Sequence, residues 1–207
     1  PQVCDGPMGV GPTALVPLTL KGTIDGKAMG RIDVSGERAA ADVRWLAYAA
    51  TNRDLGLHGA AVIGSDAWIR EPFAGWRRAT TAEVADATLD LTAFRTALSP
   101  DDRAAAESRG VGVIEGARAR QCRIAIDGPT FRAAFPQVVW LAGEADLGHW
   151  RGQLDYWVFL DGQIGRITGS ANGNAADIEE GALQATIEVE LNATDRGTPI
   201  RVMPPAP

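Results

Sequence analysis

The sequence predicts an α+β domain built on a strongly curved antiparallel sheet, a half-barrel, with short helices on its concave face. Apolar and polar residues alternate along roughly nine or ten short segments joined by turn dipeptides, which is typical of antiparallel strands in hairpin order. A few segments with helix-start signals interrupt these strands. A sheet of this size must curl, and short helices can then cover its concave face.

The composition is that of a globular protein with one domain. The chain has 207 residues, of which 45% are apolar and 22% are charged. We expect a Pro- and Gly-rich arm over residues 1–17, a single domain over residues 18–203 and a Pro-rich tail over residues 204–207. Every apolar run is shorter than the roughly 18 residues that a membrane-spanning helix needs.

The first part of the domain reads as a meander of antiparallel strands. Alternation begins at Leu18 and continues to the turn dipeptide Asp25-Gly26. The expected strands before the first helix are residues 18–24, a strand through Ile32 and Val34 that turns at Ser35-Gly36, and residues 39–45, 57–63 and 67–70.

Helix-start signals fall between the early strands and the centre of the chain. Thr80 and Glu83 have the spacing of a capping box, and Asp90 precedes residues with a helical apolar period. Ser99 stands before a Pro and two acidic residues, which favours an N-cap, and Gly110 is the expected stop.

The stretch 111–141 organises the fold. A long alternating strand, with Cys122 on its apolar face, is expected to end at Gly128-Pro129 and to lead into a short helix. Phe131 and Phe135 are four residues apart and would share one helix face until Pro136 ends the turn. Later strands are expected over residues 154–160, 164–167, 183–192 and 199–203, with a flexible loop over residues 170–177.

The charge of the chain disfavours two classes of partner. The formal net charge is −6 and no run of basic residues occurs. Nucleic-acid binding needs a concentrated Lys and Arg surface, so it is not expected. The same charge argues against adhesion to anionic lipid headgroups.

The two cysteines, Cys4 and Cys122, leave two interpretations open. A disulfide between them would tie the N-terminal segment to the central strand. Two buried free thiols would give the same sequence pattern.

The residues give no constellation for catalysis or metal binding. The only histidines, His58 and His149, have no second ligand at metal spacing near them. No nucleophile elbow, phosphate loop or dinucleotide fingerprint occurs. We therefore expect no enzyme, no catalytic residue, no metal and no cofactor.

Six tryptophans against two tyrosines are unusual, and they are spread over most of the expected elements. They suit either a packed core or the wall of a ligand cavity. The tryptophans are Trp45, Trp68, Trp76, Trp140, Trp150 and Trp157.

Four segments together resemble the LppX/LprAFG-type bacterial lipoproteins, whose fold is similar to that of the lipoprotein carriers LolA and LolB. The segments are DAWIREPFAGW (66–76), GVIEGARARQCRIAIDG (112–128), YWVFLDGQIGRI (156–167) and DRGTPIRVMPP (195–205). The resemblance spans nearly the whole chain. It implies a half-barrel around helices, an apolar cavity between them, and an extracytoplasmic location in the bacterial cell envelope. A lipid anchor upstream of Pro1 would be the protein's only link to the membrane.

Two functions follow as hypotheses for a monomeric protein. The first is a carrier that binds lipid or another hydrophobic small molecule in the cavity, without catalysis. The second is a surface lipoprotein with a filled core that docks a protein partner. Alternation along the expected elements selects the cavity residues: Leu20, Ile24, Val34, Val43, Trp45, Ile63, Phe131, Phe135 and Trp140.

Overall fold

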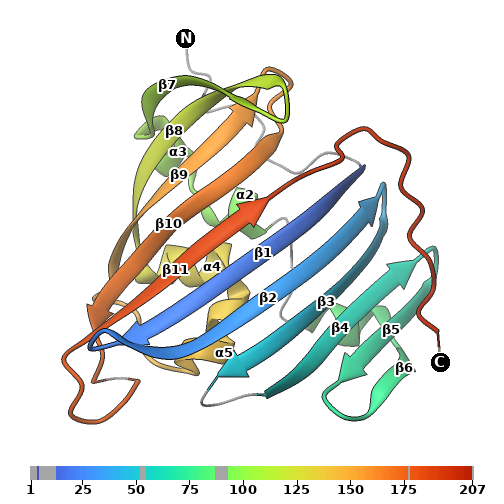
Figure 1. Cartoon of the computed structure of the whole chain (residues 1–207), viewed down its shortest axis with the longest axis horizontal. Coiled ribbons are helices and arrows are strands. Elements are labelled where there is room, and N and C mark those ends of the chain that lie inside the picture. The colour runs from blue at the N-terminus through green and yellow to red at the C-terminus, as the bar shows by residue number, and fades with distance from the viewer. Residues whose placement is uncertain (1–3, 5–12, 52–54, 87–92, 177, 207) are drawn as a thin grey trace.

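A single antiparallel sheet of eleven strands forms the body of the computed structural model (Figure 1). The structure describes residue 4 and residues 13–51, 55–86, 93–176 and 178–206. The strand order is β6-β5-β4-β3-β2-β1-β11-β10-β9-β8-β7. The sheet is open, with β6 and β7 at its two edges.

The elements of the first half are β1 (Thr13–Ile24), β2 (Lys27–Ala39), β3 (Asp42–Thr51), β4 (Leu55–Ile63), β5 (Asp66–Glu71), β6 (Gly75–Ala79), α1 (Thr81–Asp86), α2 (Ala93–Ala97) and α3 (Pro100–Ala104). Those of the second half are β7 (Glu107–Ile114), β8 (Ala117–Asp127), α4 (Gly128–Ala134), the 3-10 turn η1 (Pro136–Val138), α5 (Val139–Ala142), β9 (Arg151–Phe159), β10 (Ile164–Asn174) and β11 (Gln184–Asn192).

Two meanders meet at the centre of the sheet. Strands β1 to β6 follow each other in space as they do in sequence, and so do β7 to β11. The first and last strands then pair, with Leu20 opposite Val189. This β1–β11 ladder joins two halves that are far apart in the sequence.

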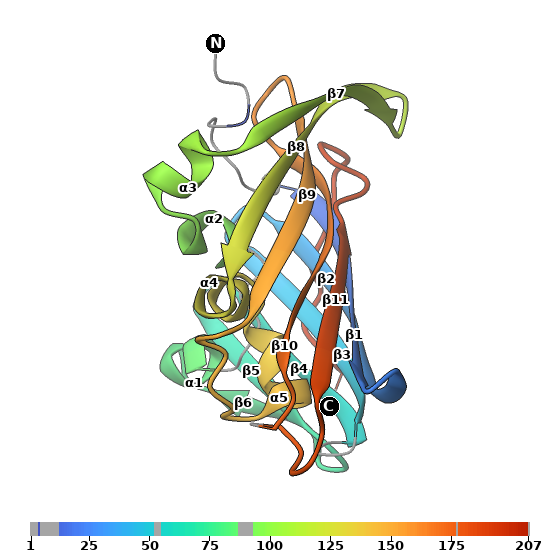
Figure 2. The ribbon, with the colours of Figure 1, turned by 90° about the vertical axis from the view of Figure 1, so that its left-hand side faces the viewer.

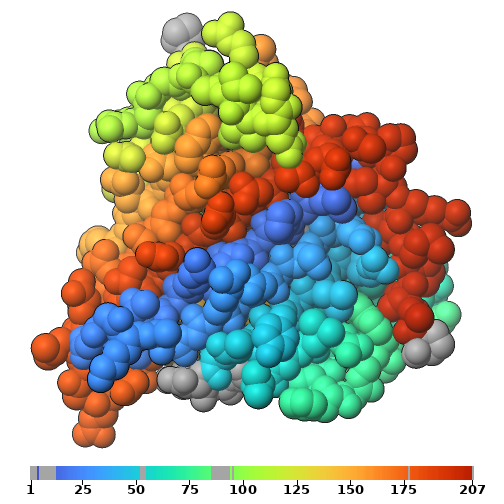
Figure 3. All heavy atoms as spheres, viewed as in Figure 1, coloured from blue at the N-terminus to red at the C-terminus, as the bar shows by residue number. Residues whose placement is uncertain are grey.

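The short helices lie together on one face of the sheet, here named the helix-covered face (Figure 2). Helix α4 packs on β8, β9 and β10, α5 packs on β2 and β3, and α1 packs on β4 and β5. The other side, named the open face, is turned towards the viewer in Figures 1 and 3. Among the described residues, no helix has the length and apolar content needed to cross a membrane.

The main core lies between the helices and the helix-covered face. Alternate residues of β1, including Val16, Leu18 and Leu20, are buried there, because successive side chains of a strand point to opposite faces. On β8 the buried residues are Cys122, Ile124 and Ile126, as their alternation predicted.

Several predicted boundaries in the early strands are wrong. Strand β1 begins at Thr13, so the expected arm over residues 1–17 overlaps it by five residues. The expected turn at Ser35-Gly36 lies inside β2, where Gly36 pairs with Val16 and Trp45. The chain reverses instead between β2 and β3, where Ala40 has a φ of 53°.

The predicted central strand is in fact a hairpin. Strands β7 and β8 meet at Glu115-Gly116, where both residues have positive φ, at 49° and 76°. The helix expected to stop at Gly110 ends earlier, at Ala104, and Gly110 lies inside β7.

Three later predictions also need correction. The segment expected as a loop over residues 170–177 continues β10 as far as Asn174. Leu183 precedes β11 and is exposed. Residues 199–203, expected as a closing strand, form no strand. Asp90, the expected cap of the second helix, lies outside the described residues.

Candidate hydrophobic ligand site

Four aromatic side chains meet beneath the helices. The ring of Phe131 lies 5.3 Å from that of Phe135, and Phe94 of α2 lies 6.2 Å from Phe135 and 5.6 Å from Tyr156 of β9. All four side chains are buried. Tilted and edge-on rings at these distances attract one another, so the cluster fixes α2 and α4 on the sheet.

Local chemistry places α4 at the end of β8. Asp127 is the N-cap, and its carboxylate accepts a 2.8 Å hydrogen bond from the backbone N–H of Thr130. Hydrogen bonds from the side chain of Thr130 and then from its backbone hold the pKa of Asp127 below its usual value. A Cβ on Gly128 would lie 2.0 Å from the carbonyl oxygen of Leu147, so only glycine permits this close approach.

A disulfide joins Cys4 to Cys122, which settles the alternatives left open by the sequence. The Tyr156 hydroxyl donates a buried 3.1 Å hydrogen bond to the carbonyl oxygen of Cys4. Cys4 is therefore held on the helix-covered face, next to the aromatic cluster.

Most of the predicted cavity residues are packed rather than open. Their exposed fractions are 8% or less, so protein atoms surround these side chains in place of water. These residues are Leu20, Ile24, Val34, Trp45, Phe131 and Phe135.

A strip of half-buried residues lies on the helix-covered face between α1 and α5, and we name it the β3–β5 strip. It consists of Val43, His58, Val62, Ile69 and Trp140. Val43 is directly opposite Val62, and Ile69 is opposite Ala60, so β3, β4 and β5 present one continuous surface. Two of its members, Val43 and Trp140, are predicted cavity residues, and both pack against the core.

His58 and Trp140 form one end of the β3–β5 strip. Their rings are stacked, with centroids 4.9 Å apart and planes inclined by 21°. Trp140 belongs to α5, which is only four residues long. The stack therefore connects the short helix α5 to the sheet at one end of the β3–β5 strip.

Ile63 is the one predicted cavity residue that the structure places elsewhere. Its neighbour Val62 faces the helices because it pairs with Val43. Successive side chains of a strand alternate, so Ile63 points to the open face. The sequence pattern of β4 concealed this, because both Val62 and Ile63 are apolar.

A charged cluster borders the β3–β5 strip along β6. Arg77, opposite Ile69 in the ladder, donates 2.9 Å hydrogen bonds to both Glu71 and Glu83. The backbone N–H of Thr80, with further hydrogen bonds from Arg77 and the Thr80 side chain, lowers the pKa of Glu83 to about 2. The strip thus has an apolar floor and an ionic border.

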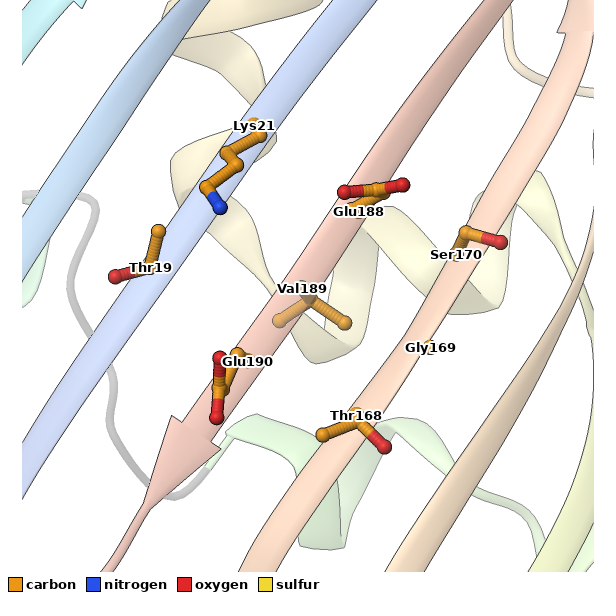
Figure 4. Close-up of a pocket in the computed structure, with 8 residues that line it drawn as sticks. All are labelled: Thr19, Lys21, Thr168, Gly169, Ser170, Glu188, Val189 and Glu190. Carbon is orange, nitrogen blue, oxygen red and sulfur yellow. The ribbon is translucent and has the colours of Figure 1, made fainter.

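A separate hollow of about 330 Å³ lies on the open face at the β1–β11–β10 junction (Figure 4). Its walls carry hydroxyl, carboxylate and ammonium groups from Thr19, Lys21, Thr168, Ser170, Glu188 and Glu190. This polar surface has nothing in common with the predicted apolar site. The described residues contain no group of three or more His, Cys, Asp or Glu side chains that could hold a metal ion.

Sequence analysis missed three residues of the aromatic and strip regions. Phe94 lies in the segment after Asp90 that has a helical apolar period, Tyr156 lies in the expected strand over residues 154–160, and His58 has no second ligand at metal spacing near it. Alternation shows which face a residue occupies, but it does not show which distant element packs on that face. Their pairing depends on where α2 and α5 lie.

Comparison with solved structures finds bacterial proteins with a similar chain course. The lipoprotein LppX of Mycobacterium tuberculosis is 16% identical over 93% of this chain and 90% of that chain, with a TM-score of 0.45. LprF from Mycobacterium bovis is 13% identical over 95% and 90%, with a TM-score of 0.49. The course of this chain is similar to those of the lipoprotein LppX and of LprF.

A LolA superfamily protein from Nitrosomonas europaea is also similar, at 10% identity over 98% of this chain and 92% of that chain, with a TM-score of 0.28. No family model and no curated protein matches the chain.

Proposed function

We propose that this protein binds the acyl chain of a lipid, or a similar hydrophobic small molecule, on the β3–β5 strip. The observation that supports this most directly is the strip itself, an apolar surface that is only half covered and is continuous with the core. An acyl chain laid between α1 and α5 would complete its burial.

The hydrophobic effect would supply the affinity. Each methylene group that leaves water contributes about 0.8 kcal/mol, so a partly covered chain of several methylene groups binds without any charged contact. The Arg77 cluster at the border offers a polar environment for the end of the ligand. Because the deeper core is filled, the ligand would lie at the strip and not beneath α4.

The proposed setting is the bacterial cell envelope, outside the cytoplasm. The Cys4–Cys122 disulfide supports it, because such bonds persist in oxidising compartments and are rare in the cytosol. No catalytic step belongs to this proposal.

Two adjacent residues of β4 give a matched test. Val62→Asp puts a carboxylate on the strip, and Ile63→Asp puts the same group on the open face. A charge beside an acyl chain loses water, so Val62→Asp should weaken fatty-acid uptake by roughly tenfold or more, and Ile63→Asp should leave it near the wild-type value. Titration with a fluorescent fatty acid measures both.

Native mass spectrometry gives an independent check. A mass of several hundred daltons, on the order of one acyl lipid, should leave the protein on denaturation, and the extract should contain acyl chains. Equal uptake by both variants, or no uptake by the wild-type protein, would refute the proposal.

A protein-docking module with a filled core is the second candidate. It is favoured by the near-complete burial of six of the predicted cavity residues. A protein that is ligand-free and takes up no added fatty acid or phospholipid would support this candidate over the carrier.

A further inference from the structure

The turn between β5 and β6 carries an aromatic side chain that has no role in folding. Phe73 is 91% exposed, and its φ of 65° lies in the left-handed region. A bulky residue rarely adopts this conformation, and exposing a whole phenyl ring is unfavourable in water. Strain and exposure at one residue are typical of a functional contact.

Phe73 is part of a larger apolar surface, here named the wing patch. The patch consists of Tyr48, Leu55, Leu57, Phe73 and Trp76. Leu55 is 59% exposed and Tyr48 is 50% exposed. The start of β4 touches the β5–β6 turn, because a Cβ on Gly56 would lie 2.7 Å from Pro72. Both segments lie at the same end of the sheet (Figure 1).

The strand register places the rest of the wing patch on the open face. Tyr48 pairs with Leu57, and Leu57 and Gly59 share one face of β4 because they are two residues apart. The ring of Trp76 lies over Gly59, so Trp76 is on the same face. Figure 3 shows this side of the sheet, where β3 to β6 form the lower right of the molecule. Phe73 belongs to the β5–β6 turn and Leu55 is the first residue of β4, whereas Tyr48 and Trp76 lie within β3 and β6.

A basic residue accompanies the aromatic ones. Arg70 pairs with Trp76 in the β5–β6 ladder. Its side chain is half-buried, with Nε covered and without a hydrogen-bond partner, and no ion pair joins it to another residue that the structure describes. Most other arginines near it are neutralised, such as Arg78 by Asp66 and Arg77 by two glutamates. Together with Arg70, the wing patch therefore combines an apolar tip, amphipathic rings and a positive charge, although the whole chain is acidic.

We propose that the wing patch docks on the surface of an anionic phospholipid bilayer. Phe73 and Leu55 enter the boundary between headgroups and acyl chains, Tyr48 and Trp76 lie at headgroup level, and Arg70 pairs with lipid phosphate. This contact is a second link to the membrane, distinct from the anchor that the sequence resemblance implies. It revises the expectation drawn from net charge, because a local surface and not the average charge meets the lipid. The proposal does not depend on ligand uptake at the β3–β5 strip.

Sedimentation with phosphatidylcholine vesicles, with and without phosphatidylglycerol, tests the proposal. The wild-type protein should bind the anionic vesicles. Phe73→Gly should weaken this binding by roughly tenfold, because burial of the ring is lost. Arg70→Gln should weaken it by roughly fivefold, and the loss should be smaller on vesicles without phosphatidylglycerol, whose surface carries no net negative charge.

Leu160→Ser is the matched control, because Leu160 is 90% exposed but belongs to the β9–β10 turn, outside the wing patch. It should bind vesicles as the wild-type protein does. Glycine adopts positive φ without strain, so Phe73→Gly should unfold at the same temperature as the wild type or higher. Loss of vesicle binding then reports on docking and not on misfolding.

Three results would overturn the proposal. They are an absence of vesicle binding by the wild-type chain, unchanged binding by Phe73→Gly, and a dimer in sedimentation equilibrium that dissociates in Phe73→Gly. The last result would identify a second copy of the chain as the partner. Fatty-acid uptake measured without vesicles should be unchanged in Phe73→Gly. A failure of the docking proposal is therefore distinguishable from a failure of the carrier proposal.

Discussion

At the scale of single residues, Asp127 links stability to pH. Its carboxylate caps α4, and its pKa lies below the usual value in the folded state. The stabilisation is present above the unfolded-state pKa of about 4 and is lost as the pH falls through the lower folded-state pKa. Asp127→Ala should lower the free energy of unfolding by about 1 kcal/mol at neutral pH.

Urea denaturation at several pH values measures this effect. The difference between the wild type and Asp127→Ala should shrink as the pH falls below about 4, because the protonated carboxyl is a weaker acceptor. A variant at Ser99 is the control, because the Ser99 hydroxyl accepts a hydrogen bond from the N–H of Asp102 at the start of α3 and does not ionise. A gap that is constant down to the lowest pH would contradict a role for the charged cap.

At the scale of elements, the junction between β8 and α4 depends on Gly128. A Cβ at this position would lie 2.0 Å from Leu147 and 2.8 Å from Trp150. Gly128→Ala should therefore force α4 away from the sheet and cost about 1–3 kcal/mol, as overpacked cores do. Gly116→Ala is the comparison, because Gly116 lies in a turn with positive φ and no atom lies within 4 Å of the new Cβ. This variant adds backbone strain without overpacking, so it should cost less free energy of unfolding than Gly128→Ala.

The elements also show how much of the fold could be predicted. Alternation correctly assigned the buried faces of β1 and β8, and helix caps at Thr80 and Ser99 are both confirmed by reciprocal hydrogen bonds. The hairpin at Glu115-Gly116 was missed because glutamate is not a usual residue of a turn with two positive φ angles. Gly36 predicted a turn but lies in a ladder opposite Trp45, so a Ser-Gly dipeptide alone did not identify the chain reversal.

The candidate site was less predictable than the fold for a physical reason. Strand periodicity selected Val43 and Trp45 correctly for the helix-covered face, yet it could not separate a packed side chain from a half-covered one. That difference depends on α1 and α5, which meet β4 and β3 only after the chain has folded. Ile63 was misplaced because one apolar residue follows another on β4.

At the scale of the whole molecule, the Cys4–Cys122 disulfide spans 118 residues and closes a loop over more than half of the chain. Cross-linking so long a loop restricts the unfolded chain strongly, which predicts a loss of about 2–5 kcal/mol when both cysteines are replaced by alanine. Guanidinium denaturation of this double variant measures the loss. Tyr156→Phe keeps the disulfide but removes the hydrogen bond to Cys4, so it should lose about 1 kcal/mol. A double variant that loses no more than Tyr156→Phe would show that packing around Cys4, and not the covalent link, holds the N-terminal segment on the helix-covered face.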